Sequence, residues 1–275
     1  MIAAGLAFYA ATSAETVLRV SLVPDEAPFV LRSKFIPLSK YLEKKIGMKI
    51  EFRPSSDANA LIDALAANKL DMAWFSGFDF VRARSRSDNQ VIPIVQRAED
   101  TQTRSVFITA RNDITKLEDL AGKVFSFGEK SSTSGHLMPR FFLRTAYMGP
   151  DIQMEHLIYA DSNMGVVTAV AGGMADAGVL NKAIWERMLA NGEVNSKLLH
   201  VFHTTPAYHD YNWTVHVDMD SNLRQRLTDA FLSMDQRIGI DKEILAMQRA
   251  SRFISTTPKN YSPIESVARS SGMLK

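Results

Sequence analysis

The first 75 residues alternate short apolar runs with longer segments of helical period. The short runs are rich in β-branched residues and end at Pro or polar residues, which predicts strands. Pro near the start of the first helical segment and Gly after its end mark its termini, and Asp57 can cap the next helix. This β-α-β-α-β order predicts a mostly parallel sheet with helices on both faces. The expected strands are 18–23, 49–52 and 72–75, and the expected helices are 37–46 and 58–68.

The same alternation begins again after Arg104 and predicts a second α/β unit. Its expected strands are 105–109, 124–127, 156–159, 177–180 and 198–202, and its expected helices are 134–147, 164–171 and 182–190. A strand at 213–217, a helix at 223–238 and a helical tail then return to the first unit. We therefore predict lobe 1 at 17–104, lobe 2 at 105–208 and a return to lobe 1 at 209–275, with a site where strand ends of both lobes meet.

The N-terminal run MIAAGLAFYAATSA is apolar and ends in Thr12-Ser13-Ala14, a small-x-small sequence. It lacks the basic start of a secretion signal, and it is shorter than the roughly 20 apolar residues that span a bilayer. We interpret residues 1–16 as a signal-peptide remnant and expect export to the periplasm. The alternative is an ordinary N-terminal tail.

Composition narrows the classes of function. The chain has 275 residues, 46% hydrophobic and 23% charged, as in ordinary globular proteins. Its formal net charge of +2 gives no sign of the concentrated basic surface that nucleic-acid binding requires, so nucleic acid is not an expected partner. The absence of Cys excludes disulfides and Cys-based metal centres. No cofactor and no metal site are expected.

The most distinctive local feature is the segment Gly128-Glu129-Lys130-Ser131-Ser132-Thr133-Ser134-Gly135-His136, between a predicted strand and a predicted helix. Four consecutive hydroxyl residues can donate hydrogen bonds, and the helix start adds unpaired N–H groups and the positive end of its dipole. Together they fit a small tetrahedral oxyanion. The alternative is that Ser132 or Ser134 only caps the helix.

The segment SSTSGHLMPRFFL resembles the phosphate/phosphite/phosphonate-binding family of periplasmic ABC-importer substrate-binding proteins. Four other segments agree with that family in order and spacing: PLSKYLEKKIG, DALAANKLDMAWFSGFDFV, ITKLEDLAGKVFSFG and AVAGGMADAGV. The resemblance implies a two-lobed type II periplasmic-binding-protein fold, with mixed, mostly parallel sheets and a ligand cleft between the lobes. It implies that the chain is a monomer and is not an enzyme. It also implies that the lobes close on a small oxyanion, which is then delivered to an inner-membrane permease. It also assigns the oxygens of that anion to Ser131, Ser132, Thr133 and Ser134.

Three positions depart from the family pattern. Ala58 and Thr103 each occupy a position where members often carry Tyr, and Asn163 occupies one where they often carry His. These departures leave the identity of the phosphorus oxyanion open among phosphonate, phosphite and phosphate. Asn163 can still donate an amide N–H to the anion. Arg104 is a candidate counter-charge, with a surface salt bridge as its alternative.

Three further candidates come from the ends of strands and from the helix start. Ser76 follows the strand 72–75 and is expected to face the anion from lobe 1, while Asn181 follows the strand 177–180 in lobe 2. His136 lies on the first turn of the predicted helix, where its alternative is a packed or surface histidine. The neighbouring Trp74 and Phe75 are interpreted as core aromatics.

Two other classes of function stay open. One is an enzyme that reuses the same fold, but no G-x-S-x-G or P-loop motif is present. Such an enzyme would need titratable groups in the cleft, and only His136 and Asp176 are expected near it. The other is a periplasmic sensor that presents its closed form to a receptor.

Overall fold

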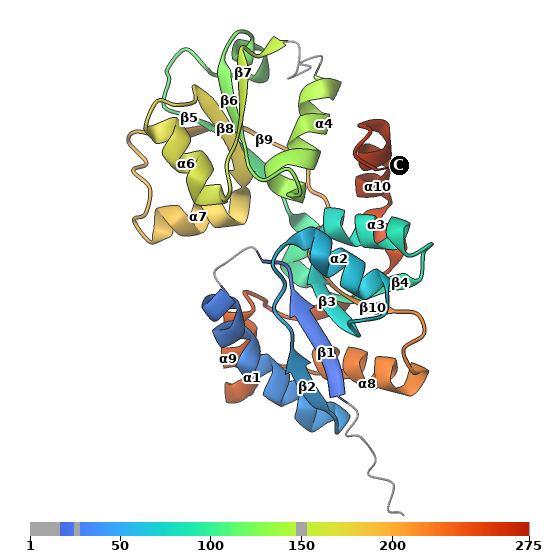
Figure 1. Cartoon of the computed structure of the whole chain (residues 1–275). Coiled ribbons are helices and arrows are strands. Elements are labelled where there is room, and N and C mark those ends of the chain that lie inside the picture. The colour runs from blue at the N-terminus through green and yellow to red at the C-terminus, as the bar shows by residue number, and fades with distance from the viewer. Residues whose placement is uncertain (1–16, 25–27, 147–152, 275) are drawn as a thin grey trace, which may run out of the picture.

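The structure is a computed structural model that describes residues 17–24, 28–146 and 153–274, and it consists of two α/β lobes (Figure 1). The prediction of two lobes is therefore confirmed. The signal-peptide remnant predicted at 1–16 lies outside the described residues. Within the described ranges, no helix is both long and apolar enough to cross a membrane.

Lobe 1, the lower lobe in Figure 1, is built on a six-stranded sheet of order β11-β4-β10-β3-β1-β2. The strands β1, β2 and β3 are parallel, whereas β10 runs antiparallel to both β3 and β4. The returning chain thus supplies β10 to the middle of the sheet. The strand bounds are β1 Val17–Leu22, β2 Lys49–Phe52, β3 Met72–Phe75, β4 Val91–Arg97, β10 Asn212–His216 and β11 Phe253–Ser255.

Helices cover both faces of this sheet. A first apolar cluster joins the sheet to α1 and α8 through Phe35, Trp213 and Phe231. A second cluster joins it to α2, α3 and α10 through Phe75 and Phe80. The helices are α1 Pro28–Ile46, α2 Ala58–Ala66, α3 Gly77–Arg86, α8 Ser221–Leu232, α9 Gly239–Met247 and α10 Ser262–Ser270, with short 3-10 turns η1 Ala98–Gln102 and η4 Pro258–Tyr261.

Lobe 2 is built on a five-stranded sheet of order β7-β6-β8-β5-β9. The strands β6, β7 and β8 are parallel, and β5 is antiparallel to both of its neighbours. Its strands are β5 Ser105–Thr109, β6 Val124–Phe127, β7 His156–Tyr159, β8 Ala177–Asn181 and β9 His200–Thr204. Its helices are η2 Leu117–Leu120, η3 Thr133–Leu137, α4 Met138–Thr145, α6 Asn163–Ala171 and α7 Lys182–Ala190.

Two segments of chain connect the lobes, one between η1 and β5 and the other between β9 and β10. They lie side by side, because the Tyr208 N–H donates to the Thr103 carbonyl at 3.0 Å. The buried hydroxyls of Tyr208 and Ser105 are 2.7 Å apart at the same place. Two adjacent crossing segments are the arrangement about which lobes of this kind rotate.

The sequence misplaced several helix boundaries. The helix predicted at 37–46 begins nine residues earlier, at Pro28, and Pro37 lies inside it. An internal Pro costs about 3 kcal/mol. The buried side chains of Phe35, Leu38 and Leu42 lie on one face of this helix, and each contributes about 1.5–3 kcal/mol. Packing therefore outweighs the local cost. The helix predicted at 223–238 is α8, which ends at Leu232, and α9 begins only at Gly239, beyond the predicted range.

Candidate functional site

A cavity of about 80 Å³ lies between the lobes, where the chain leaves β3 in lobe 1 and β6 in lobe 2. Pockets for drug-sized ligands usually measure roughly 300–1,000 Å³, so this cavity suits a much smaller ligand. We call it the inner cavity. It is lined by Val23, Ser76, Asp79, Gly128, Glu129, Ser131, Ser132, Thr133, Ser134, Gly135, Asp161, Ser162, Asn163, Asp210 and Tyr211.

The lobe 2 wall is the hydroxyl-rich turn that the sequence singled out. This turn folds tightly on itself, because the Gly128 N–H donates to the Gly135 carbonyl at 2.9 Å. A Cβ atom on Gly135 would lie 2.9 Å from the Ser132 Oγ and 3.2 Å from the Gly128 Cα. Glycine is thus required where the two ends of the turn approach each other.

The helix that follows the turn directs its N-terminus at the inner cavity. Its first five residues form the π-helical turn η3, and α4 continues it without a break. The Ser132 Oγ accepts the Gly135 N–H at 2.9 Å and so caps the helix, as one alternative expected. Capping and anion binding are compatible, because the first turn of a helix leaves several N–H groups without intrahelical partners.

Thr133 connects the two lobes. Its Oγ1 accepts the backbone N–H of Phe78, at the start of α3 in lobe 1, at 3.0 Å. Its hydroxyl also hydrogen-bonds to the carboxylate of Asp210, which lies in the second crossing segment. Thr133 is almost fully buried. It therefore holds the lobe 2 turn against the helix start of lobe 1.

Asp210 places a buried carboxyl group at the inner cavity. Only 1% of the residue is exposed, and its Oδ1 accepts the Gly77 N–H at 2.9 Å. Burial, together with the nearby Asp100, raises the pKa of Asp210 to about 7 even though the bonds from Gly77 and Thr133 and the charge of Arg97 lower it. The group is therefore poised to gain or lose a proton near neutral pH.

The remaining lobe 1 wall combines a helix cap with an aromatic platform. Ser76 caps α3, because its Oγ accepts the Asp79 N–H at 3.2 Å and donates to Asp79 Oδ2 at 2.7 Å. Tyr211 stacks on Trp74 with ring centroids 5.5 Å apart. The Arg97 guanidinium lies 5.0 Å from the Trp74 centroid and 5.3 Å from that of Tyr211. The Tyr211 ring is thus fixed at the cavity wall by contacts on lobe 1.

Ser131, Ser134 and Asn163, predicted as anion ligands, also line the inner cavity. Asn181 does not line it, but its Nδ2 donates to the Ser134 Oγ at 3.3 Å. Its Oδ1 accepts two N–H groups at the start of α7, and its own N–H donates to the Asn163 Oδ1 at 3.0 Å. These bonds favour a supporting role for Asn181, while its contact with an anion stays a prediction.

His136 and Arg104 point elsewhere. The His136 Nδ1 is 3.0 Å from the Lys130 carbonyl oxygen, and its ring makes edge contacts with Phe127 and Tyr159. Arg104 donates to the Thr205 carbonyl at 2.8 Å in the crossing segments. Neither residue lines the inner cavity, although His136 lines a wider cleft that leads out of it. Their observed partners favour packing and hinge roles, and anion binding by either stays a prediction.

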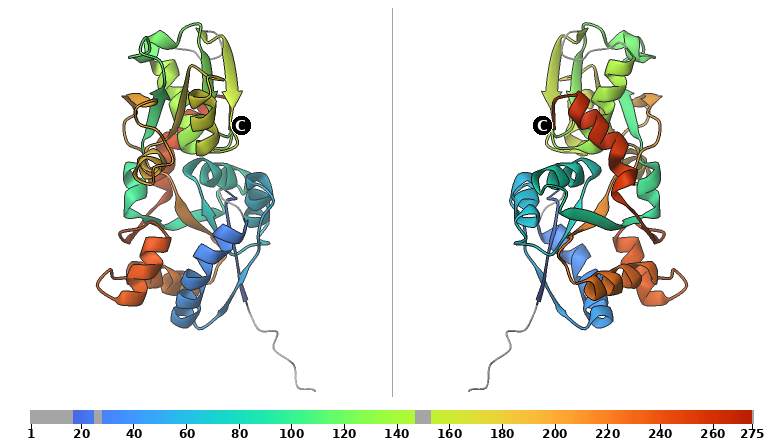
Figure 2. Two further views of the ribbon diagram at one scale, coloured as in Figure 1. Left: turned by 90° about the vertical axis from the view of Figure 1, so that its left-hand side faces the viewer. Right: turned by 90° about the vertical axis from the view of Figure 1, so that its right-hand side faces the viewer.

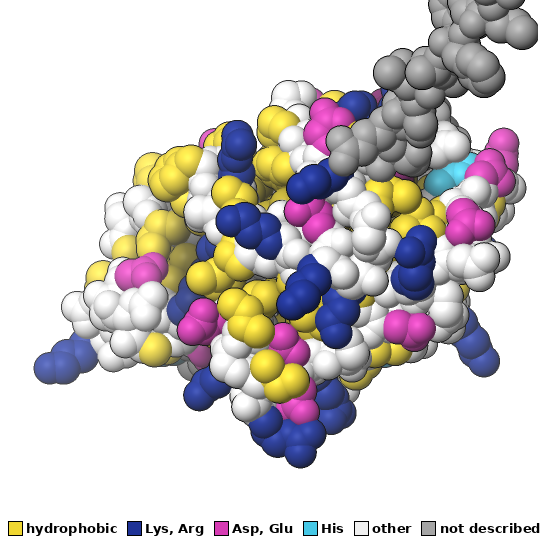
Figure 3. All heavy atoms as spheres, turned by 90° about the horizontal axis from the view of Figure 1, so that it is seen from below, with side chains coloured by type: hydrophobic (Ala, Val, Ile, Leu, Met, Phe, Trp, Pro, Cys, Tyr) yellow, Lys and Arg dark blue, Asp and Glu magenta, His cyan; other side chains and the backbone are white. Residues whose placement is uncertain are grey.

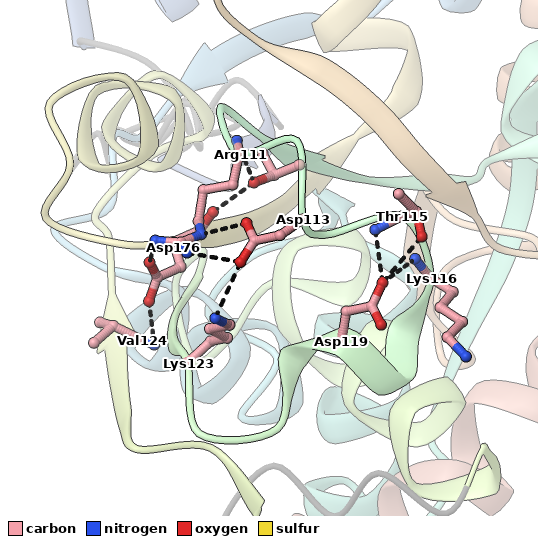
Figure 4. Close-up of polar contacts among 9 residues, drawn as sticks. Arg111, Asp113, Thr115, Lys116, Asp119, Lys123, Val124 and Asp176 are labelled. Atoms are coloured by element: carbon pink, nitrogen blue, oxygen red, sulfur yellow. Dashed lines mark hydrogen bonds and ion pairs between the residues drawn. The ribbon is translucent and has the colours of Figure 1, made fainter.

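Asp176, the second titratable group expected near the cleft, lies at the opposite end of lobe 2. Its Oδ2 accepts the N–H of Val124, the first residue of β6, at 2.9 Å. The inner cavity lies at the other end of that strand, beyond its last residue. Asp176 also pairs with Arg111 at 3.0 Å (Figure 4). The expected placement was wrong, because the loop before β8 approaches the amino end of β6.

A wider cleft of about 920 Å³ leads outward from the inner cavity. We call it the outer cleft. The two spaces share Val23, Glu129, Ser131 and Asp161. Charges of both signs lie around it, including Asp57 and Arg82 from lobe 1 and Lys130 and Arg140 from lobe 2. The lower face of lobe 1 likewise mixes basic and acidic side chains (Figure 3).

The sequence missed Asp210 and Tyr211 as site residues. Their segment has no strand or helix period. No local signal distinguishes them, because only the second crossing segment brings them to the cavity. Across the described ranges, no group of three or more His, Asp or Glu residues is arranged to hold a metal ion.

Comparison with known proteins gives consistent matches. The family model described as "ABC transporter, phosphonate, periplasmic substrate-binding protein" matches residues 20–261. The probable ABC transporter phosphite binding protein PhnD1 of Prochlorococcus marinus (strain MIT 9301) is 32% identical over 269 residues, which cover 92% of this chain and 89% of that protein.

Solved structures agree in fold. The structure of PhnD1 from the same organism in complex with methylphosphonate matches with a TM-score of 0.84, covering 93% of this chain and 98% of that one. A binding protein component of an ABC phosphonate transporter from Pseudomonas aeruginosa, 20% identical, matches with a TM-score of 0.78, covering 92% and 86%. At that identity the second match shows the fold alone.

Proposed function

The chain belongs to the phosphonate-binding family of periplasmic substrate-binding proteins of ABC transporters, and from this premise we propose that it captures a small phosphorus oxyanion in the inner cavity and delivers it to an importer. The observation that carries the proposal is the inner cavity itself. It is small, it lies between two lobes, and one helix N-terminus and four consecutive hydroxyl residues face it. Phosphonate, phosphite and phosphate share the tetrahedral oxyanion that such a wall binds.

In this proposal the lobe 2 turn supplies most of the anion contacts. Ser131, Ser132 and Ser134 offer hydroxyls, the start of η3 offers N–H groups, and Asn163 offers an amide. Thr133 contributes by holding the lobes together at the anion. Bonds of this kind stabilise an anion without a full counter-charge at the site, which allows the ligand to be released again.

We assign Asp210 the role of a proton-dependent contact. A carboxylate in an anion site repels a fully ionised ligand, but it accepts a hydrogen bond from a ligand that carries a proton on one oxygen. Phosphoryl groups have a second pKa of about 6, so part of the population keeps such a proton near neutral pH, whereas sulfate keeps none. The buried carboxyl therefore favours phosphorus oxyanions over sulfate.

The proposed mechanism is lobe closure about the two crossing segments, with lobe 1 comprising 17–104 and 209–275 and lobe 2 comprising 105–208. The anion contacts groups of both lobes only in the closed form, so binding shifts the population towards closure. A permease in the inner membrane then recognises the closed shape of a periplasmic monomer. A sensor would present the same shape to a receptor, and transport assays in vesicles holding the cognate permease and ATPase distinguish the two.

We expect the purified protein to be stabilised by phosphite, methylphosphonate or phosphate but not by sulfate, acetate or glucose. Ligand that binds only the folded state adds about 2.7 kcal/mol of stability at a concentration one hundred times Kd. Thermal denaturation with each anion, followed by calorimetric titration of those that stabilise, measures the effect. Stabilisation by carboxylates or sugars alone would refute the ligand class.

The same samples test the enzyme alternative. A binding protein returns its ligand unchanged, so ³¹P NMR after prolonged incubation is expected to show only the starting anion. Conversion of the anion to a second phosphorus species would instead favour an enzyme.

A further inference from the structure

The helix α10 contacts both lobes beside the inner cavity. It runs along one flank of the molecule, from lobe 1 towards α4 of lobe 2 (Figure 2). Its buried residues share one apolar cluster with α3 of lobe 1 and with the helix that follows the hydroxyl-rich turn of lobe 2. The cluster includes Phe78, Phe80, Val81, Leu137, Met138, Ile264, Val267 and Ala268. A segment near the end of the chain thus packs behind the anion site.

Ile264 of α10 packs against Gly77, the neighbour of Ser76 in the wall of the inner cavity. Only 1% of this residue is exposed. Its Cδ1 lies 2.5 Å from the position that a Cβ atom on Gly77 would occupy, and the Asp210 Cα lies 3.4 Å from that position. Ile264 therefore packs flat against the first residue of α3, at the point where the backbone faces Asp210.

The first turn of α3 is the part of lobe 1 that Ile264 supports. The Gly77 N–H donates to Asp210 at 2.9 Å, and the next N–H, that of Phe78, donates to Thr133 at 3.0 Å. Hydrogen bonds weaken steeply when distance or angle changes. A shift of this turn would thus disturb a carboxyl group and a cross-lobe hydroxyl at the inner cavity together.

We propose that Ile264 is a positioning residue for the anion site: it never touches the ligand, but its side chain fixes the start of α3 and hence Asp210 and Thr133. The inference rests on the proposed function and adds a determinant of affinity outside the cleft. Supporting residues that lock the contacts of a binding site are a general requirement for tight binding.

The test compares Ile264→Ala with Ile244→Ala. Ile244 is also 1% exposed and belongs to lobe 1, but it lies on α9 in the cluster with α1 and α8, which contains no residue of the inner cavity. Both variants lose the same side-chain atoms from a core, so we expect similar decreases in the denaturation midpoint. Only Ile264→Ala is expected to weaken methylphosphonate binding, by about tenfold in Kd.

Equal Kd values for the two variants would overturn the proposal. If either alanine variant fails to fold, Ile264→Val and Ile244→Val provide the same comparison with a smaller void. If the wild-type protein binds none of the phosphorus oxyanions, the proposed function fails, and the comparison is made with whichever anion of the panel binds. The two failures are therefore distinguishable.

A compensating pair tests the contact directly. Gly77→Ala adds a methyl group against the Ile264 Cδ1 and is expected to weaken binding. In Gly77→Ala/Ile264→Ala the added methyl group has room, so the loss should be smaller than the sum of the two single losses. Additive losses would contradict a direct coupling between the two positions.

Discussion

The double variant Ser132→Ala/Thr133→Ala is expected to bind methylphosphonate at least a hundredfold more weakly than the wild-type protein. A hydrogen bond to a charged group contributes about 1.5–3 kcal/mol, and each 1.4 kcal/mol changes Kd about tenfold. Ser132 supplies one such bond to the anion, and the cross-lobe bond between Thr133 and Phe78 holds the site together. The loss of both therefore accounts for at least a hundredfold. The variant also loses the Ser132 cap, whose Oγ accepts the Gly135 N–H.

Calorimetric titration measures this effect, and Ser39→Ala/Thr145→Ala is the matched control. Those two hydroxyls each donate to a carbonyl of their own helix, Ser39 to Ile36 and Thr145 to Phe142, away from both cavities. The control is expected to bind as the wild-type protein does. Wild-type affinity in the Ser132/Thr133 variant would refute the assignment of the turn.

Single variants at Thr133 test whether its hydroxyl joins the two lobes. Thr133→Val keeps the shape of the side chain but can neither accept the Phe78 N–H nor donate to Asp210, whereas Thr133→Ser keeps both bonds. The serine variant should retain most of the affinity, and the valine variant should lose most of it. Equal binding by both would mean that the hydroxyl is not what joins the lobes.

Asp210→Asn is expected to remove a large part of the pH dependence of stability between pH 4 and pH 7. Burial raises the pKa of Asp210 from 3.8 to about 7 in the folded protein. Over this range the folded state keeps a proton that the unfolded state has released, so rising pH favours unfolding. The stabilisation is fully present below about pH 4 and is lost as the pH rises through 7. This rise in the pKa corresponds to on the order of 4 kcal/mol in the free energy of unfolding.

Urea denaturation of the wild-type protein and of Asp210→Asn at a series of pH values measures the free energy of unfolding of each. The difference between the two pH dependences is the contribution of Asp210. The asparagine variant should also bind phosphite with less dependence on pH above 7, because no carboxylate then repels the anion. Parallel curves for the two proteins would show that Asp210 does not titrate in this range.

Much of the fold follows from local sequence. The strands β3, β5, β6 and β7 and the helix α7 lie at the predicted bounds, and Asp57 caps α2 as expected. In these elements a short apolar run or a helical period ends at clear Pro, Gly or Asp signals. The hydroxyl-rich turn is equally local, since a strand, a turn and a helix start follow one another in the chain.

Other elements escaped the sequence because tertiary contacts decide them. Pro93 lies inside β4, although proline is unusual within a central strand. The helix α3 carries Arg82, Arg84 and Arg86, which are typical of a solvated face, yet its residues Phe78, Phe80 and Val81 are buried. In both cases burial against distant segments outweighs the local signal.

The sequence by itself determined two α/β lobes and a hydroxyl-rich turn between β6 and η3, since neighbouring residues set strand and helix periods and their ends. Only the tertiary structure decided what completes the wall of the inner cavity. Thr133 meets Phe78 across 55 positions of sequence, and Asp210 meets Gly77 across 133. Such contacts depend on how two sheets and two crossing segments pack, because the free energy that holds them comes from burial shared by the whole molecule rather than from any local pattern.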